Sequence, residues 1–275
     1  MAFSDIQQIT VNGVRYAYRT AGEGVPLVLL HGFTGSSASW SDVAESLSQR
    51  YRVIAPDLLG HGQTESPEDA TRYSIGLAAQ DLGDLLTLIC DEPVLLLGYS
   101  MGGRLALYFA LYFPQQVRAL ILESASPGLA TQAERNARQH SDAALAASLL
   151  ETGLETFINQ WEALPLFETQ QAVSPEVRQR LRDQRLQNSP NGLANSLRGM
   201  GTGMQPSLWP KLVELVPPTL LLTGLLDAKF TNIAQQMAEQ LTDVKHHIIR
   251  AAGHTIHLEQ PMQFVQSVNG FLADR

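Results

Sequence analysis

The chain has 275 residues, of which 44% are hydrophobic and 17% are charged. This is an ordinary globular composition, and the length suits one large α/β domain with an inserted subdomain. A formal net charge of −8 argues against a general nucleic-acid binder or a ligand of anionic membranes, without excluding a local cationic pocket. The single cysteine, Cys90, excludes an internal disulfide framework and a cysteine-based metal cluster.

The N-terminal stretch Met-Ala-Phe-Ser-Asp lacks the charged and apolar regions of a secretory signal. No apolar run reaches the roughly 20 residues that a membrane-spanning helix needs. We therefore expect a cytoplasmic protein with no membrane or nucleic-acid partner, and the sequence leaves its oligomeric state open.

Short apolar runs alternate with helical patterns along the first 125 residues. Asn12-Gly13, between Gln8–Val11 and Val14–Tyr18, predicts a hairpin with a positive-φ turn. Further strands are expected at 26–30, 52–56, 93–97 and 118–122. Helices are expected over 40–47, over 74–89 with Ser74 as N-cap, and from the elbow described below up to Pro114. This alternation predicts a mainly parallel sheet covered by helices on both faces.

Strand-like runs disappear between residues 126 and 207. The segment is polar, helical and rich in arginine, and it is too long to be a structureless loop. We expect a helical cap over 126–207, inserted between two parts of an α/β core, 1–125 and 208–275. Strands at 218–223 and 244–249 and helices over 232–241 and 260–272 resume the α/β pattern.

The stretch Gly98-Tyr99-Ser100-Met101-Gly102 joins a predicted buried strand to a predicted buried helix. Glycines at these positions allow a sharp turn and a close approach of strand and helix. A serine at the tip of such a turn is strained and exposed, and the next N–H lies at a helix N-terminus, which is the nucleophile-elbow arrangement. The alternative is a glycine-rich turn with an incidental serine.

A serine hydroxyl needs a neighbour that removes its proton, and in this fold the order is Ser, Asp or Glu, His. Asp227 follows the strand ending at 223, and His254 follows the strand 244–249. Loops after parallel strands meet at one rim, so Ser100, Asp227 and His254 are predicted to form a triad. Asp227 could instead be a helix N-terminal charge, and His254 a loop histidine bound to backbone. His257 is expected to begin a helix.

Developing negative charge on an oxygen needs hydrogen-bond donors. The backbone N–H groups of Met101 and Phe33 are the expected pair, because one follows the serine and the other lies in the loop after an early strand. His31 and Gly32 are expected to shape that loop. His61, in Gly60-His61-Gly62, is expected to anchor a loop and not to act directly. The alternative is that this loop is only a tight turn.

These features resemble the α/β-hydrolase fold over essentially the whole chain. Beyond the triad, five stretches together resemble the 2-succinyl-6-hydroxy-2,4-cyclohexadiene-1-carboxylate synthase family of menaquinone and phylloquinone biosynthesis: Gly98–Arg104, Glu123–Leu129, Glu134–Asp142, Trp161–Phe167 and Arg185–Pro206. The resemblance implies a lyase that removes a ring proton and expels pyruvate from a cyclohexene substrate with three carboxylates. It implies no cofactor and no metal.

The family's arginines map onto Arg104, Arg138 and Arg185, which the resemblance implies as ligands of a small polycarboxylate substrate. The planar guanidinium matches a carboxylate in two hydrogen bonds, and Arg104 lies one helical turn past Ser100. A salt bridge or a solvated helix face is the alternative for each arginine. Tyr99 and Trp161 are expected either to pack on the substrate or to belong to the core. Arg135 is a weaker candidate ligand, and a solvated face is expected for three others, Arg178, Arg180 and Arg182.

Two other functions share this fold and triad. A serine hydrolase of esters or of carbon–carbon bonds would turn over a simple aryl ester rapidly, and the arginine-bearing cap argues against it. A non-catalytic receptor of small ligands would bind tightly without turnover. The scaffold alone does not separate these functions.

Overall fold

A computed structural model describes residues 3–273 and 275. Its centre is an eight-stranded sheet with the order β1-β2-β4-β3-β5-β6-β7-β8. The pairs β1–β2 and β2–β4 are antiparallel, and the pairs from β4 through β3 to β8 are parallel. The strands span Gln7–Val11, Val14–Ala21, Pro26–Leu30, Arg52–Pro56, Val94–Tyr99, Val117–Glu123, Thr219–Gly224 and Val244–Ile249. The expected α/β-hydrolase architecture is confirmed.

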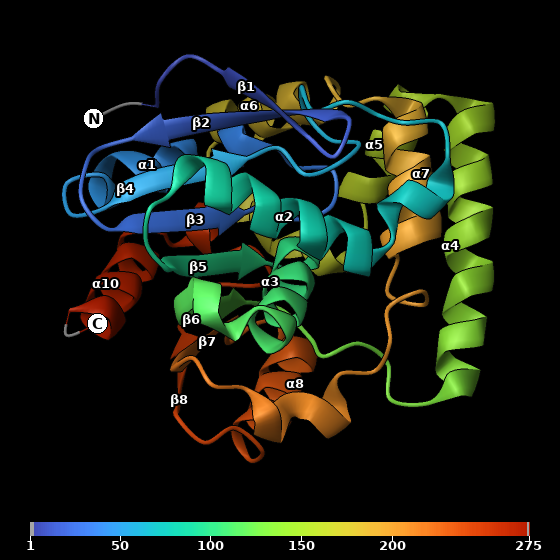
Figure 1. Cartoon of the computed structure of the whole chain (residues 1–275). Helices are drawn as coiled ribbons and strands as arrows, with labels where there is room; N and C mark the ends of the chain where they lie inside the picture. Colours follow the sequence, from blue (N-terminus) through green and yellow to red (C-terminus); the bar gives the residue numbers. More distant parts are fainter. Residues whose placement is uncertain (1–2, 274) are drawn as a thin grey trace.

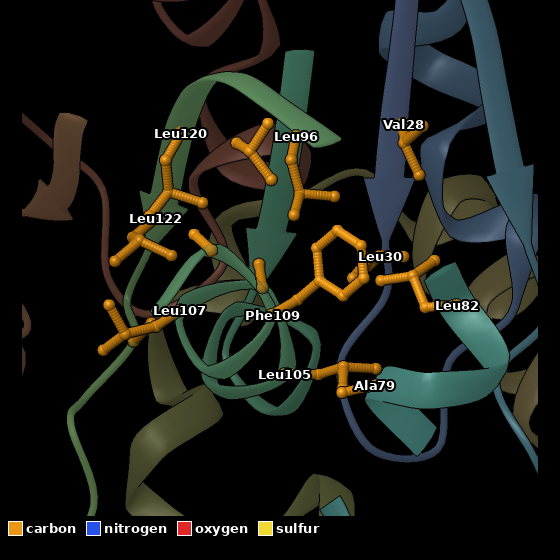
Figure 2. Packing of buried hydrophobic residues seen from close by; sticks show 14 of the residues in the cluster. Val28, Leu30, Ala79, Leu82, Leu96, Leu105, Leu107, Phe109, Leu120 and Leu122 are labelled. Carbon is orange, nitrogen blue, oxygen red and sulfur yellow. The ribbon is translucent and has the colours of Figure 1, made fainter. Parts of the chain in front are cut away.

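Alternating side chains of the central strands supply two apolar faces, as a sheet buried on both sides requires. One face packs on α2, α3 and α8, and the other on α1, α9 and α10 (Figure 1). Figure 2 shows Phe109 of α3 reaching the sheet beside Leu30, with Leu82 of α2 next to it. These helices span Ser41–Leu47 (α1), Ile75–Ile89 (α2), Met101–Tyr112 (α3), Ala228–Ala238 (α8), Ile256–Glu259 (α9) and Pro261–Leu272 (α10).

The segment between β6 and β7 is helical. It contains α4 (Gln132–Thr152), α5 (Leu154–Glu162), the 3-10 helix η4 (Pro165–Ala172), α6 (Pro175–Arg185) and α7 (Pro190–Met200). A separate apolar cluster joins α4, α5 and α7 around Phe157 and Leu193. In Figure 1, α4 and α7 lie beyond the arrowheads of β3 and β5. We infer that residues 126–207 form a cap over the carboxyl ends of the parallel strands.

Most predicted elements lie where the sequence pattern places them. Asn12 and Gly13 have φ values of 48° and 78°, so the hairpin turn is confirmed, and the Ser74 side chain caps α2 at Leu77 N. Several boundaries differ by a few residues, and α8 (Ala228–Ala238) differs from the expected 232–241 at both ends. The 3-10 helix η1 (Ser37–Trp40) precedes α1, and α8 begins at Ala228 rather than 232, because Asp227 caps it.

None of the helices described combines the length and apolar composition that crossing a bilayer requires. The N-terminal stretch considered above includes Met1 and Ala2, which lie outside the described residues.

Candidate active site

Ser100 lies at the junction of β5 and α3 with φ 50° and ψ −106°. Positive φ is costly for a residue with a side chain, so the surrounding structure must hold this turn in place. The flanking glycines are the reason that it can close. A Cβ on Gly98 would overlap the carbonyl oxygen of Gly102, and a Cβ on Gly102 would overlap that of Leu30. The strand–turn–helix therefore has the predicted elbow form.

The structure brings the three predicted triad residues together, although 154 residues separate Ser100 from His254. His254 Nε2 lies 3.0 Å from Ser100 Oγ, and His254 Nδ1 lies 2.7 Å from Asp227 Oδ2. The histidine is 1% exposed and the aspartate 7%. In a base catalyst, this arrangement directs the basic Nε2 at the hydroxyl while the carboxylate holds the ring.

Asp227 makes both of the contacts that the sequence left open. Its Oδ2 faces His254, whereas its Oδ1 accepts a hydrogen bond of 3.2 Å from Phe230 N at the start of α8. The carboxylate is thereby fixed at two points. The ring of Phe230 lies 4.6 Å from that of His254 and covers it.

A second histidine–carboxylate pair lies close by. His257 Nδ1 is 2.8 Å from Glu123 Oε2, and its backbone N–H donates to Glu123 Oε1 at 3.0 Å. Glu123 is fully buried at the end of β6, and the His257 ring packs on Trp40 at 4.3 Å. His257 does lie in a helix, α9, as expected. Its partner was not foreseen, since 134 residues separate the two.

The loop after β3 carries the first predicted oxyanion donor, Phe33. His31 shapes it as expected: its Nδ1 donates to Gly32 O, and its Nε2 accepts from Leu58 N at 2.9 Å. This pairing is that of a neutral imidazole, and burial lowers the pKa of His31 to about 4. His61 Nδ1 pairs with Leu59 O in the neighbouring loop, also as expected.

Phe33 and Met101 both line the cavity that contains Ser100. Met101 is the first residue of α3, and the first four N–H groups of a helix have no acceptor within it. That amide is therefore open to an oxyanion at the elbow. The donor role of the two amides stays a prediction.

The cavity has a volume of about 330 Å³. This is within the range of sites for small molecules. The core contributes Ser100, His254 and Arg104, and the inserted segment contributes Arg138 and Trp161. Aromatic and aliphatic side chains make up much of the remaining wall, including Leu129, Leu166, Phe167, Leu197, Met200, Phe230 and Ile233.

Two of the three predicted arginine ligands line this cavity. Arg104 is 8% exposed and donates to Gln205 Oε1 at 2.8 Å and to Met200 O at 2.9 Å. Burial lowers its pKa to about 10, which leaves it charged at neutral pH. Arg138 donates to Asp142 Oδ1 at 2.7 Å, and 42% of its side chain is exposed. Arg138 therefore forms a salt bridge, which was the alternative expected for it, and it also lines the cavity.

Arg185 is the exception. It lines two neighbouring cavities but not the one that contains Ser100. Its guanidinium lies 5.6 Å from the centre of the Phe167 ring, and Phe167 lies between it and His254. Its Nη1 is paired with Glu162 Oε1 at 2.9 Å. As the structure stands, Arg185 is a buried ion-pair residue beside the site, and substrate binding by it stays a prediction.

Three other arginines of this segment pair with neighbouring groups. Arg135 donates to Leu129 O and Ala130 O, which tie the start of α4. The solvated face expected for α6 is partly wrong, because Arg180 bridges to Asp42 of the core and Arg182 to Glu162. Both pairs hold α6 against its neighbours.

Tyr99 and Trp161 also line the Ser100 cavity. The Tyr99 hydroxyl is hydrogen-bonded to Thr255 Oγ1 at 2.7 Å, and burial raises the pKa of the phenol well above its usual range. Trp161 lies 5.1 Å from the Phe33 ring, and its buried Nε1 has no partner among the described residues. Tyr99 is therefore fixed as part of the cavity wall, whereas the indole N–H of Trp161 can still donate a hydrogen bond.

Comparisons with known proteins agree with this geometry. The family described as α/β hydrolase fold matches residues 25–261. A Bacillus subtilis protein provisionally named 2-succinyl-6-hydroxy-2,4-cyclohexadiene-1-carboxylate synthase is 46% identical over 267 residues, 96% of this chain and 97% of the relative. A Serratia proteamaculans protein with that enzyme name is 31% identical over 90% of this chain and 93% of its own. The chain belongs to the 2-succinyl-6-hydroxy-2,4-cyclohexadiene-1-carboxylate synthase family.

Solved structures point the same way. MenH from S. aureus superposes with a TM-score of 0.90 at 40% identity, covering 97% of this chain and 99% of that one. A thermophilic esterase from Thermogutta terrifontis has a TM-score of 0.86 at 28% identity, with 98% of each chain covered. The fold is therefore common to synthases and esterases, so the cavity lining must separate them.

Sequence reasoning missed two residues at this site in the synthase-family chain, one in the cavity wall and one behind it. Lys229 lies at the cavity wall, two residues after Asp227, with its Nζ 5.6 Å from the centre of the Phe230 ring. Gln205 lies behind Arg104 and is fully buried. The position of Lys229 beside the predicted triad aspartate was a signal that could have found it. Nothing in the sequence pairs Gln205 with Arg104, which lies 101 residues away.

Proposed function

We propose that this chain is a lyase that removes a ring proton and eliminates pyruvate from 2-succinyl-5-enolpyruvyl-6-hydroxy-3-cyclohexene-1-carboxylate. One observation carries the proposal. The strained Ser100, hydrogen-bonded to His254, opens into the same cavity as the guanidinium groups of Arg104 and Arg138. A substrate with three carboxylates suits such a cavity, and a neutral aryl ester does not need it.

In the proposed reaction, His254 Nε2 takes the proton of Ser100 Oγ, and Asp227 keeps the imidazole oriented. The serine oxygen then accepts the ring proton, and no acyl-enzyme forms. The electrons of the broken C2–H bond form the C2=C3 double bond of the product, and the electrons of the original C3=C4 double bond shift to form C4=C5. The C5–O bond breaks as they do so. The enolpyruvyl group leaves as the enolate of pyruvate, which takes up the proton held on His254 and becomes pyruvate.

Negative charge develops on the succinyl carbonyl oxygen as the ring proton leaves. The amides of Phe33 and Met101 are proposed to stabilise it, which is the electrostatic assistance that an oxyanion hole supplies. Arg104 and Arg138 are proposed to hold carboxylates of the substrate, one from the core helix α3 and the other from α4. A role for Arg185 requires that its guanidinium exchange Glu162 for the substrate and pass Phe167.

The decisive experiment measures pyruvate release from the enolpyruvyl substrate beside hydrolysis of a simple aryl ester. We expect rapid pyruvate release and little ester hydrolysis. Replacing Ser100 by alanine should lower the rate of pyruvate release by about a thousandfold, since a positioned base contributes about that much. Near-full pyruvate release by the variant would overturn the base assignment.

The structural likeness to an esterase makes ester hydrolysis the second candidate function. Ester hydrolysis faster than pyruvate release would favour a hydrolase on the same fold. Tight substrate binding without turnover of either compound would favour a receptor. The arginines offer a further check, because Arg104→Met should raise KM for the enolpyruvyl substrate by about tenfold, the effect of losing one charge-assisted contact.

A further inference from the structure

Gln205 is hydrogen-bonded to the buried guanidinium of Arg104 but carries no charge that would neutralise it. Its Oε1 accepts a 2.8 Å hydrogen bond from Arg104 Nη1, and the carbonyl oxygen of Met200 accepts one from Nη2 at 2.9 Å. Both acceptors are uncharged. Within the described part of the chain, no carboxylate oxygen lies within salt-bridge distance of the Arg104 guanidinium. Burying such a charge is expensive, so an unpaired arginine inside a protein needs a reason.

The orientation of the Gln205 amide is set by its neighbour. A guanidinium only donates hydrogen bonds, so the amide oxygen and not its nitrogen must face Arg104. The Nε2 group is left buried and without a partner in the described residues. It lies against Gly128, where a Cβ would be 3.1 Å away. A glutamate here would pair with Arg104 and avoid an orphaned N–H2 group, so the neutral amide gives up stability.

The same loop also positions the helix that carries Arg138. Gly203 O accepts a 2.9 Å hydrogen bond from Gln139 Nε2, and a Cβ on Gly203 would lie 2.6 Å from Gln139 N. Gly201 lines the cavity, and a Cβ on it would lie 2.5 Å from Asp142 Oδ2, the carboxylate that holds Arg138. The segment 200–205 thus contacts the supports of both cavity arginines.

We propose that Gln205 is a positioning residue for the elimination: it fixes the Arg104 guanidinium toward the Ser100 cavity and leaves its positive charge available for a substrate carboxylate. The inference rests on the proposed function, because the carboxylate belongs to the enolpyruvyl substrate. Gln205 itself does not line the cavity, so it acts through Arg104.

The test compares three variants by KM, kcat and thermal midpoint. Gln205→Glu keeps the shape and the acceptor but cancels the charge, so KM should rise by about tenfold with kcat changed less, while the thermal midpoint is equal or higher. Gln116→Glu is the matched control, half-buried at the amino end of β6, and should change KM less than about twofold. A KM for Gln205→Glu equal to that of the control would overturn the proposal.

A double-mutant cycle tests whether Gln205 acts through Arg104. Gln205→Met should raise KM in the native background, but should change it less than about twofold when added to Arg104→Met. Equal effects in both backgrounds would show a general structural role and contradict the proposal. If Gln205→Met does not fold, the isosteric Gln205→Glu still decides.

A binding readout separates this inference from the proposed function. If the native enzyme releases no pyruvate, the proposed function fails, and citrate then serves as the tricarboxylate probe. Citrate should raise the thermal midpoint of the native protein and of Gln116→Glu. It should raise that of Gln205→Glu much less, and an equal rise in all three would overturn the role of Gln205.

Discussion

The histidines of two buried histidine–carboxylate pairs lie three residues apart in sequence, and the two pairs differ in what surrounds the ring. His254 is held by Asp227 at 2.7 Å and presents Nε2 to Ser100 at 3.0 Å. His257 is held by Glu123 at 2.8 Å and packs between Trp40 and Phe264. The carboxylate alone therefore does not make a base. A polar group that can give up its proton must also lie on the far side of the ring.

The largest expected difference between the pairs is in catalysis. His254→Gln should lower kcat for pyruvate release by about a thousandfold, because the acceptor of the serine proton is lost. His257→Gln should keep kcat within about threefold, because its ring packs on Tyr99, Trp40 and Phe264 and not on a residue that moves the proton. Steady-state kinetics of the two variants checks this, and equal losses would break the comparison.

Replacing the two carboxylates should lower kcat in the same order as replacing the two histidines, with a smaller loss. Asp227→Asn should lower kcat by about a hundredfold, since the amide can favour the wrong imidazole tautomer. Glu123→Gln is the matched change in the other pair and should leave kcat nearly unchanged. Should Glu123→Gln prove the more damaging of the two, the assignment of the triad carboxylate would be wrong.

Stability should show the reverse order. His257→Gln leaves Glu123 fully buried without its ring partner, so the free energy of unfolding should fall by about 3 kcal/mol. His254→Gln should cost less, because Asp227 is 7% exposed whereas Glu123 is fully buried, and each carboxylate keeps one backbone hydrogen bond. Urea unfolding curves measure both values. A His257→Gln protein as stable as the native one would contradict a structural role for this pair.

The last contrast concerns the buried histidines whose ring nitrogens meet backbone groups. Burial lowers the pKa of His31 to about 4 and that of His61 to about 3. Above pH 6.5 both the folded and the unfolded protein carry these rings neutral, so they add no pH dependence. As pH falls from about 6.5 toward 4, only the unfolded chain takes up the protons, so the free energy of unfolding should fall by up to about 1.4 kcal/mol per pH unit for each ring.

This slope can be read from urea unfolding at pH 7, 6 and 5. Replacing His31 by glutamine should flatten it, whereas the same change at the exposed His140 should not. An unchanged slope in the His31 variant would mean that the ring is protonated in the folded protein.

Much of the site could be predicted because its parts are local. Gly98 and Gly102 flank Ser100, and the absence of a Cβ at both positions permits the sharp turn between strand and helix. Asp227 and His254 each follow a strand, and parallel strands bring their carboxyl ends to one rim whatever their separation in sequence. Strand order and side-chain alternation then bring His254 within hydrogen-bond distance of both Asp227 and Ser100.

The sequence by itself determined the elbow, the order of the triad and the existence of an arginine-bearing helical insertion, because these depend on short-range patterns. Only the tertiary structure decided that Glu123 belongs to His257, that Gln205 supports Arg104, and that Phe167 separates Arg185 from His254. Each of these depends on where a long side chain from one element meets another element. That meeting is set by packing across the whole molecule, which no local pattern encodes.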